Sequence, residues 1–225
     1  MTTEEHFEKS LNEREKFWSE LGDVNSDVIS HVINPAFLGG PQWPGLRQSF
    51  LMIKTESGTI FASDGLSDPY SDRDNNPDHF EYNGLGLELF VECNEKWNNI
   101  DEAKNSWQFS LLYKASQICA NNPNVLYSIK DHTYISTDAF NVPFPDEMNE
   151  EKEKIGLLLG LPSEYVPNRL KLSLEEILFV NVKLLTIEES KYVDEHDGKG
   201  RKEVAKRLIK QGNTSLSNIS RKSVI

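Results

Sequence analysis

Residues 83–93 read NGLGLELFVEC, and this stretch decides the fold class. Large apolar residues stand at every second position, at Leu85, Leu87, Leu89 and Val91. Side chains of a β-strand alternate between the two faces of a sheet, so this spacing predicts a strand. The alternate residues, Gly86, Glu88, Phe90 and Glu92, would face the other way. We therefore expect a sheet, and the neighbouring segments must supply its other strands.

Two strand candidates precede this stretch. Residues 46–55 (LRQSFLMIKT) and 59–63 (TIFAS) are joined by Glu56, Ser57 and Gly58, a turn-prone connection, and are predicted to form a hairpin. Residues 34–45 contain three prolines and three glycines, which favours a shaped loop. Residues 64–83 are polar, acidic and interrupted by proline, which favours a long ordered loop over a regular element.

Helical periodicity marks two segments. In residues 3–21 the apolar side chains recur on one stripe, Thr2 or Thr3 can cap the start, and Gly22 ends the pattern. Residues 106–121 switch from the strand period to the helical period, with Trp107 at the start and Asn121, Asn122 and Pro123 at the end. The second helix is expected to pack on the sheet.

The second half of the chain mixes both element types. Short strands are predicted at 125–129, 134–136 and 155–159, although 150–161 could also begin as a helix. Residues 178–187 are rich in β-formers, and helices are expected at 188–195 and 201–210, separated by the Asp-Gly-Lys-Gly turn at 197–200. A last short strand is expected near 216–219.

These elements predict an α/β protein of the α+β kind, with a mixed, mostly antiparallel sheet and helices packed on it. The chain shows no repeat of fixed period and no interdomain linker. We expect one domain over residues 1–225, with its core at about 25–220 and an N-terminal helix at 1–24.

The formal net charge of −12 opposes binding to nucleic acid or to an anionic membrane, since both require a basic face. A basic protein partner would be attracted instead. Residues 1–21 are charged and carry no apolar run, which predicts a cytoplasmic chain without a secretory signal. Cys93 and Cys119 are too few and too far apart for a disulfide framework, so both are expected to be buried free thiols.

No motif with catalytic or metal-binding chemistry is complete. Asp72, Asp74, Asn76 and Asp78 begin like a calcium loop, but Pro77 stands where that loop requires glycine. Ser67 lacks the second glycine of a nucleophile elbow, and the five histidines are scattered. We therefore predict no catalytic residue, no metal site and no cofactor.

Residues 201–210 form a basic run with apolar residues at the spacing of a helix. The simplest interpretation is a solvated helix face. The alternative is a surface that holds one acidic partner.

The order and spacing of several motifs resemble the Suppressor of fused family. These motifs are FASDGLSDPYSD (61–72), an acidic loop, NGLGLELFVEC (83–93) and the helix from Trp107. The C-terminal third resembles the same family in three segments: LFVNVKLLTIEES (178–190), HDGKGRKEVAKRLI (196–209) and the tail around Arg221. The resemblance implies a stand-alone N-terminal-lobe protein similar to the bacterial members, many of which are considered immunity proteins paired with toxins. Animal members hold an extended peptide, and the tyrosine after their GLSD motif, matched by Tyr70, contributes to that binding.

We therefore expect a non-enzymatic protein-binding module, an immunity protein that neutralises a cognate toxin with a basic surface. The expected partner-binding residues are Asp68, Tyr70, Asp72, Asp74 and Asp78. One alternative is a regulatory adaptor that captures an extended peptide on a sheet edge. The other is a hydrolase with dispersed carboxylates, which would require a deep pocket where acids with shifted pKa values converge.

Overall fold

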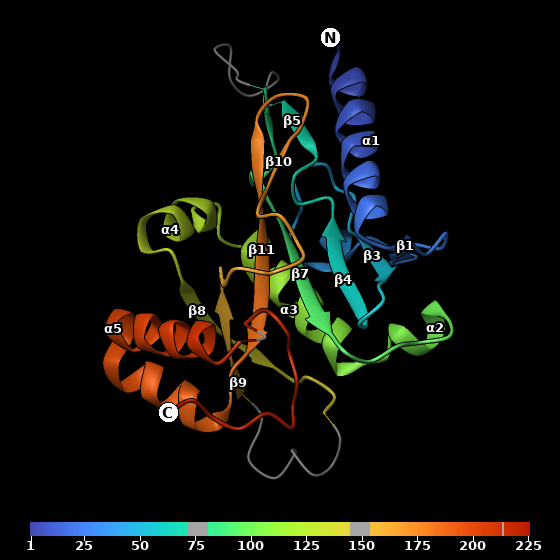
Figure 1. Ribbon diagram of the computed structural model, residues 1–225. Coiled ribbons are helices and arrows are strands. Elements are labelled where there is room, and N and C mark those ends of the chain that lie inside the picture. The colour runs from blue at the N-terminus through green and yellow to red at the C-terminus, as the bar shows by residue number, and fades with distance from the viewer. Residues whose placement is uncertain (72–80, 145–153, 213) are drawn as a thin grey trace.

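A computed structural model describes residues 1–71, 81–144, 154–212 and 214–225 (Figure 1). Nine strands of this described part join one mixed sheet. They are β1 (Asp23–Val24), β2 (Ile29–Ser30), β3 (Ser49–Lys54), β4 (Thr59–Asp64), β7 (Leu87–Cys93), β8 (Ile135–Phe140), β9 (Lys154–Leu159), β10 (Arg169–Lys171) and β11 (Glu176–Leu184). A separate pair, β5 (Pro69–Ser71) and β6 (Glu81–Asn83), forms a two-stranded sheet.

The main sheet follows the order β1-β3-β4-β7-β11-β9-β8, with β2 paired to β3 and β10 paired to β11. Every pairing is antiparallel except that of β7 with β11, which is parallel and places Leu87 opposite Leu178. The sheet is therefore mixed and mostly antiparallel, as the sequence predicts. The predicted hairpin of β3 and β4 is also confirmed, with Lys54 opposite Thr59.

The helices are α1 (Thr3–Leu21), α2 (Ile100–Ala103), α3 (Trp107–Ala120), α4 (Val125–His132) and α5 (Ile187–Gln211), with a short 3-10 turn η1 (Pro35–Leu38) in the loop before β3. Thr2 and Glu5 form a capping box at the start of α1, and Ser106 caps α3. Both predicted helices are thus confirmed, together with the capping role of Thr2. The described part of the chain contains no helix with the length and apolarity that a bilayer crossing requires.

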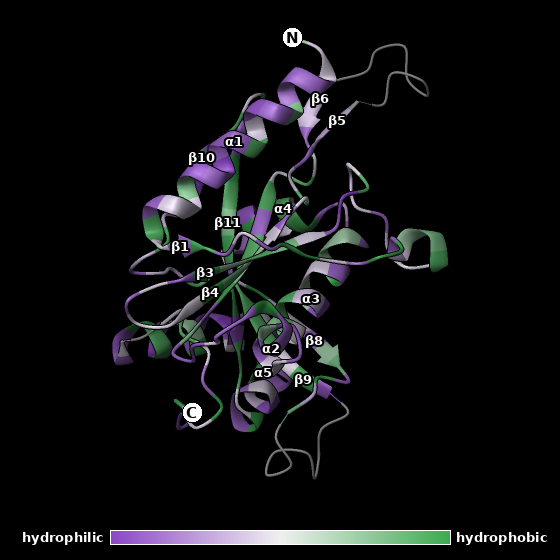
Figure 2. Cartoon of the chain, turned by 90° about the vertical axis from the view of Figure 1, so that its right-hand side faces the viewer, coloured by the Kyte–Doolittle hydropathy of each residue, from purple (hydrophilic) through white to green (hydrophobic). Residues whose placement is uncertain are grey.

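Helices cover both faces of the sheet, which explains why its central strand is buried throughout. Leu87, Leu89 and Val91 of β7 pack with α3 on one face, whereas Phe90 points to the other face and contacts Trp18 of α1. Figure 2 shows α1 and α3 on opposite sides of β3 and β4. A third apolar cluster joins α5 to β9. Strand β7 is therefore buried on both faces rather than half-exposed.

Three details differ from the sequence-based expectation. Residues 125–129 belong to the helix α4, because Val125 and Ile129, four residues apart, point into the core together. The two helices expected at 188–195 and 201–210 form one element, α5, with a kink at Asp197, where φ is 49° and ψ is −131°. The long loop expected at 64–83 contains the strands β5 and β6, while residues 72–80 lie outside the described part.

Candidate functional site

An open groove of about 520 Å³ lies beside the two-stranded sheet of β5 and β6. Tyr70 of β5 and Tyr82 of β6 stand opposite each other, with their ring centroids 5.6 Å apart. The groove is lined mainly by apolar and aromatic side chains, among them Trp43, Tyr70, Tyr82, Leu126 and Tyr127. The carboxylate of Glu175 also belongs to its wall. A groove of this composition can receive apolar or aromatic side chains of a ligand.

The aromatic rings of the groove differ in their exposure. Tyr127, on α4, is 70% exposed, and Tyr82 is 37% exposed. Tyr70 is half-buried, whereas Trp43 is fully buried and packs edge-on against Phe50 of β3. The groove therefore has a fixed floor and an accessible rim. Aromatic residues presented in this way supply large contact areas at a low cost in conformational entropy.

Glu88 of β7 fixes the segment that leads to Tyr70. Its fully buried carboxylate accepts hydrogen bonds from the backbone N–H of Gly65 at 3.0 Å and of Ser67 at 2.9 Å. It also accepts from the Ser67 hydroxyl at 2.7 Å and from the Ser63 hydroxyl at 2.5 Å. Burial raises the pKa of Glu88 above its ordinary value. This glutamate therefore holds the turn between β4 and β5 in a single conformation.

Two arginines and two aspartates form a closed ionic cluster beneath the same turn. Arg14 of α1 contacts Asp64 at 2.7 Å and Asp68 at 2.6 Å, and Arg47 contacts the same carboxylates at 2.5 and 2.9 Å. Burial by itself would raise the pKa of Asp64, but Arg14 and Arg47 outweigh it and hold this pKa below its ordinary value. The cluster ties α1 to the base of the groove, and we call it the buried charge cluster.

Asn83 connects the groove to two more distant segments. Its side-chain N–H groups donate to the Ser10 hydroxyl of α1 at 3.1 Å and to the Ser67 carbonyl at 3.4 Å. Its side-chain oxygen accepts from the backbone N–H groups of Leu174 and Glu175, each at 3.1 Å. The backbone N–H of Asn83 donates to the Glu175 carboxylate at 3.0 Å. These bonds place a carboxylate in the wall of the groove.

Gly65 occupies a position that no other residue could take without strain. Its φ is +151°, and an added Cβ would lie 2.2 Å from the Arg47 carbonyl oxygen. This glycine therefore supplies the positive backbone angle that the turn requires. The close approach brings Arg47, in the loop just before β3, within reach of the two aspartates.

The structure places the predicted partner-binding residues in different environments. Tyr70 lies in the wall of the groove. Asp68 is 0% exposed and is engaged by both arginines, so its carboxylate lies in the interior, and its contact with a partner stays a prediction. The acidic residues around Asp68 in the sequence do not indicate that Arg14, more than fifty residues earlier, pairs with this carboxylate. Asp72, Asp74 and Asp78 lie outside the described residues.

Sequence reasoning missed several residues of this site. Trp43 and Tyr127 line the groove, but the first stood in an expected loop and the second in an expected strand. Glu88 alternates with leucines, as a solvent-facing residue of a strand would. Its burial can be recognised only from the three-dimensional structure, in which the serines and the glycine that donate hydrogen bonds to it lie close by.

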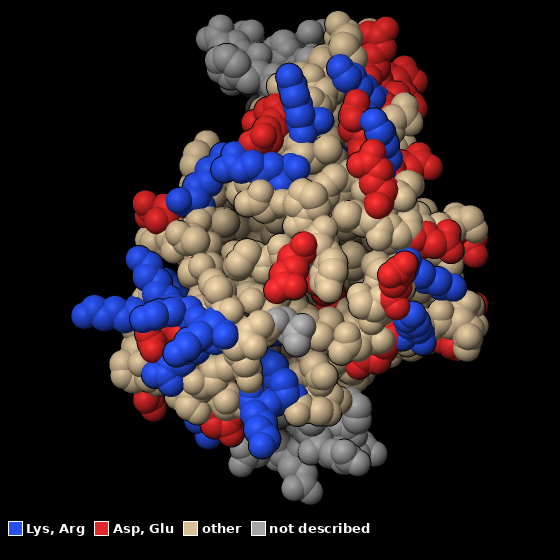
Figure 3. Space-filling model, viewed as in Figure 1, with Lys and Arg blue, Asp and Glu red and all other residues tan. Residues whose placement is uncertain are grey.

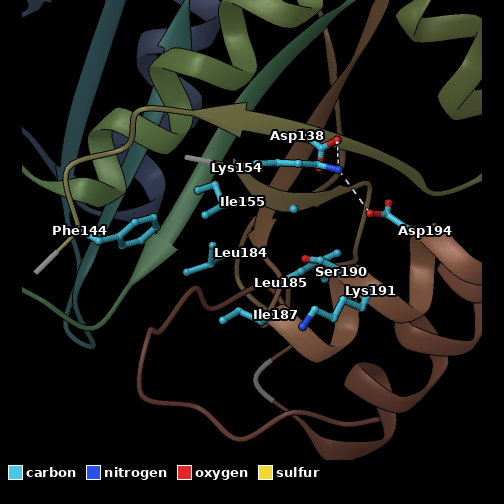
Figure 4. A pocket seen from close by; sticks show the side chains of 11 residues that line it. Asp138, Phe144, Lys154, Ile155, Leu184, Leu185, Ile187, Ser190, Lys191 and Asp194 are labelled. Carbon is cyan, nitrogen blue, oxygen red and sulfur yellow. Dashed lines mark hydrogen bonds and ion pairs between the residues drawn. The ribbon is translucent and has the colours of Figure 1, made fainter. Parts of the chain in front are cut away.

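A second pocket, of about 230 Å³, lies between β8, β9 and the start of α5 (Figure 4). In Figure 4 the ammonium of Lys154 lies between Asp138 and Asp194, at 3.1 and 3.3 Å from their carboxylates. Hydrogen bonding to Asp138 raises the pKa of Lys154. One lysine thus pairs with both carboxylates, which is an arrangement for joining a strand to a helix rather than for transferring a proton.

Glu92 lines a third cleft, of about 410 Å³, near the C-terminal end of β7. Burial raises its pKa, and its carboxylate accepts from the hydroxyls of Ser163 at 2.5 Å and Ser215 at 2.8 Å. These bonds connect two loops to the sheet, which gives Glu92 a structural role. A hydrolase of the kind weighed above would require further converging acids, and Glu88 is fully enclosed.

The two cysteines are buried and free, as predicted, and neither lines the groove. Burial raises the pKa of Cys119 to about 12 and that of Cys93 still further, so neither is a reactive thiolate. Within the described ranges, histidine, cysteine and acidic side chains do not gather in groups of three that could hold a metal ion.

Comparison with known proteins identifies the fold and the family. The sequence model of the Suppressor of fused protein family (SUFU) matches residues 49–222. A SUFU homologue from Neisseria gonorrhoeae FA 1090 matches with a TM-score of 0.58 and 14% identity, over 99% of this chain and 98% of the other. A chain of the Sufu-Fu complex matches with a TM-score of 0.57 and 14% identity, over 97% and 92%. Curated protein sequences gave no match.

Proposed function

The chain belongs to the Suppressor of fused family, and from this premise we propose that it is a non-enzymatic protein-binding module. Its groove beside Tyr70 would hold an extended segment of a partner protein. The observation that carries the proposal is an open, aromatic-lined groove supported from beneath by the buried charge cluster. A Suppressor of fused chain of the same fold has been crystallised as a Sufu-Fu complex, which agrees with a role in protein recognition.

The chemistry of the groove suggests what the partner segment contains. Tyr70, Tyr82 and Tyr127 offer ring faces and edges to an apolar or aromatic side chain. Glu175 places a carboxylate in the wall, and the whole chain carries a net charge of −12. A segment with an apolar residue next to a lysine or arginine would therefore suit this site, since the cation can contact both a ring and the carboxylate.

We further propose that the partner is a toxin and that the protein neutralises it as a cytoplasmic immunity protein. This finer role is supported by the resemblance to bacterial family members and by the acidic charge, which would speed association with a basic toxin surface. The partner would be identified by affinity purification from the native host, with the neighbouring genes read alongside. A specific partner that is not a toxin would contradict the immunity role and leave the groove proposal standing.

Substitutions within the groove test the binding site itself. Tyr70→Ala and Tyr127→Ala should each weaken partner binding by about tenfold or more, because buried aromatic contacts dominate such interfaces. Both variants should keep their free energy of unfolding within about 1 kcal/mol of the wild type. Phe140→Ala is the matched control, since Phe140 is an aromatic residue of β8 that is 52% exposed and lies outside the groove. Calorimetry with the purified partner measures the affinities.

Two results would contradict the groove proposal. One is unchanged affinity in both tyrosine variants. The other is a loss of folding in Tyr70→Ala as complete as that expected for Leu89→Asp, which places a charge in the core.

The regulatory adaptor is favoured by a different observation, at the far edge of the sheet. Strand β8 ends the strand order, and within the described part of the chain its outer edge has no strand partner. An extended peptide could add to such an edge through backbone hydrogen bonds. Hydrogen exchange on the complex separates the two candidates. Protection of residues 135–140 supports edge addition, and protection of residues 69–71 and 81–86 supports the groove.

A further inference from the structure

The second half of α5 carries a line of four lysines that the proposed function does not use. Between residues 197 and 210 the sequence contains six lysines or arginines and two acidic residues, a net charge of +4 in a chain whose total is −12. Figure 3 shows basic side chains gathered over α5 on one face of the molecule. We call the four exposed lysines of this segment the lysine stripe: Lys199, Lys202, Lys206 and Lys210.

Helix geometry places these four side chains on one face. They are separated by three or four residues, the spacing at which side chains of an α-helix become neighbours. The opposite face of the same helix is buried against β9 through Val204, Ala205 and Leu208. From Lys199 to Lys210 the stripe is about 16 Å long at the rise of an α-helix. This length matches about five residues of an extended peptide.

The positive charges of the stripe are not neutralised by neighbours in the described structure. No ion pair to Lys199, Lys202, Lys206 or Lys210 is formed by the described residues. Two nearby carboxylates serve other cations, because Glu203 pairs with Arg207 at 2.8 Å and Asp194 with Lys154 at 3.3 Å. Two others, Glu195 and Asp197, lie beside the first lysines of the stripe without forming an ion pair with them. Exposed lysines that repel one another lower the stability of a helix, so their grouping favours an anionic ligand.

The stripe begins at a hollow of about 540 Å³ around the kink of α5. Lys199 and Lys202 line it together with Arg201, His132 and His196, and the acidic residues Glu195 and Asp197 also belong to its wall. The hollow is open to solvent. Such a surface suits a chain segment that runs along the helix better than a small molecule that requires enclosure.

We propose that the lysine stripe is a second contact surface, which binds an acidic segment of a partner polypeptide. Side-chain carboxylates spaced along an extended segment would face lysines spaced along the helix, so attraction acts at each contact. A nucleic acid is the less suitable polyanion, because beyond this patch the protein is strongly negative and would repel a longer strand. The surface acts independently of the groove and does not require the proposed function.

The test uses fluorescein-labelled, acetylated hexaglutamate as the probe, with fluorescence anisotropy at pH 7 and about 20 mM salt, where charges are weakly screened. The wild type should bind it and should not bind hexaglutamine. Lys202→Ala combined with Lys206→Ala should weaken binding at least fivefold. The matched control combines Lys9→Ala with Lys16→Ala, two exposed lysines of the acidic helix α1, and should change binding less than twofold.

The remaining outcomes decide between classes of ligand and between the two surfaces. Equal affinity for hexaglutamate in both double variants would overturn the proposal, as would absence of binding to the wild type. A six-nucleotide oligothymidylate that binds as tightly, with the same dependence on the lysines, would also overturn it in favour of a general polyanion surface. Tyr70→Ala should leave hexaglutamate binding unchanged, which separates this surface from the groove.

Discussion

The buried charge cluster and the lysine stripe use the same kinds of side chain for opposite purposes. In the cluster, two arginines and two aspartates face each other in the interior, and each charge has two partners of opposite sign. On the stripe, four lysines point into solvent, and the described residues provide no carboxylate for them. The difference shows that a charged side chain is available to a partner protein only where the chain itself provides no opposite charge to pair with it.

The largest effect is expected when the cluster is opened. Arg14→Leu removes one cation and leaves Asp64 and Asp68, both buried, dependent on Arg47 alone. Removing one member of a buried ion pair costs about 3 to 5 kcal/mol, so we expect a decrease of that size in the free energy of unfolding. Urea denaturation followed by circular dichroism measures it.

An exposed pair provides the control for that measurement. Arg169→Leu breaks an ion pair with Glu176 in which both side chains are about half-exposed, and it should cost no more than about 1 kcal/mol. A similar loss in both variants would mean that the cluster contributes no more than a surface pair does.

A pH effect of intermediate size is expected from Lys183 of β11, a buried cation that donates to the Leu216 carbonyl. Burial, aided by Arg221, lowers its pKa to about 7. Above pH 7 the folded protein has released this proton while the unfolded chain still holds it. Stability therefore rises with pH, by up to about 1.4 kcal/mol per pH unit.

The comparison with Lys183→Met isolates this contribution. Between pH 7 and 8.5 the free energy of unfolding of the wild type should increase relative to that of the variant, because methionine does not titrate. At higher pH the thiols of the unfolded chain also ionise, so the interval ends there. Parallel curves for the two proteins would show that Lys183 keeps an ordinary pKa.

The smallest effect on stability is expected at the stripe. Lys202→Ala with Lys206→Ala should change the free energy of unfolding by less than about 0.5 kcal/mol, because both side chains are exposed and alanine favours helices. Thermal unfolding at 20 mM and at 500 mM salt measures it. A loss of 2 kcal/mol or more would indicate that the lysines serve the fold, and the contrast with the buried charge cluster would disappear.

Much of the fold could be predicted from the sequence because its signals are local. The alternation in β7, the turn between β3 and β4, and the cap of α1 each depend on residues close together in the chain. The helix α4 was missed because its first five residues, 125–129, are mostly apolar and fit a short strand equally well. Only their packing on the core distinguishes the two structures.

The candidate site was less predictable, because it is assembled from distant segments. Tyr70 was identified through the family resemblance, whereas Trp43, Tyr127 and Glu175 reach the same groove from three other parts of the chain. The acidic residue Asp68 was expected on the surface, since neither its charge nor its neighbours indicate that Arg14 and Arg47 enclose it. Pairing over such separations leaves no periodic pattern in the sequence.

The parallel pairing of β7 with β11 also governs what happens on the ribosome. Leu87 pairs with Leu178, so one edge of β7 stays unpaired until roughly ninety more residues have been translated. Their translation takes about 5 to 20 seconds. During that interval a nascent sheet of β3, β4 and β7 presents an apolar, unpaired strand to the solvent. Chaperones that bind nascent chains should therefore recognise this intermediate until the last third of the polypeptide closes the sheet.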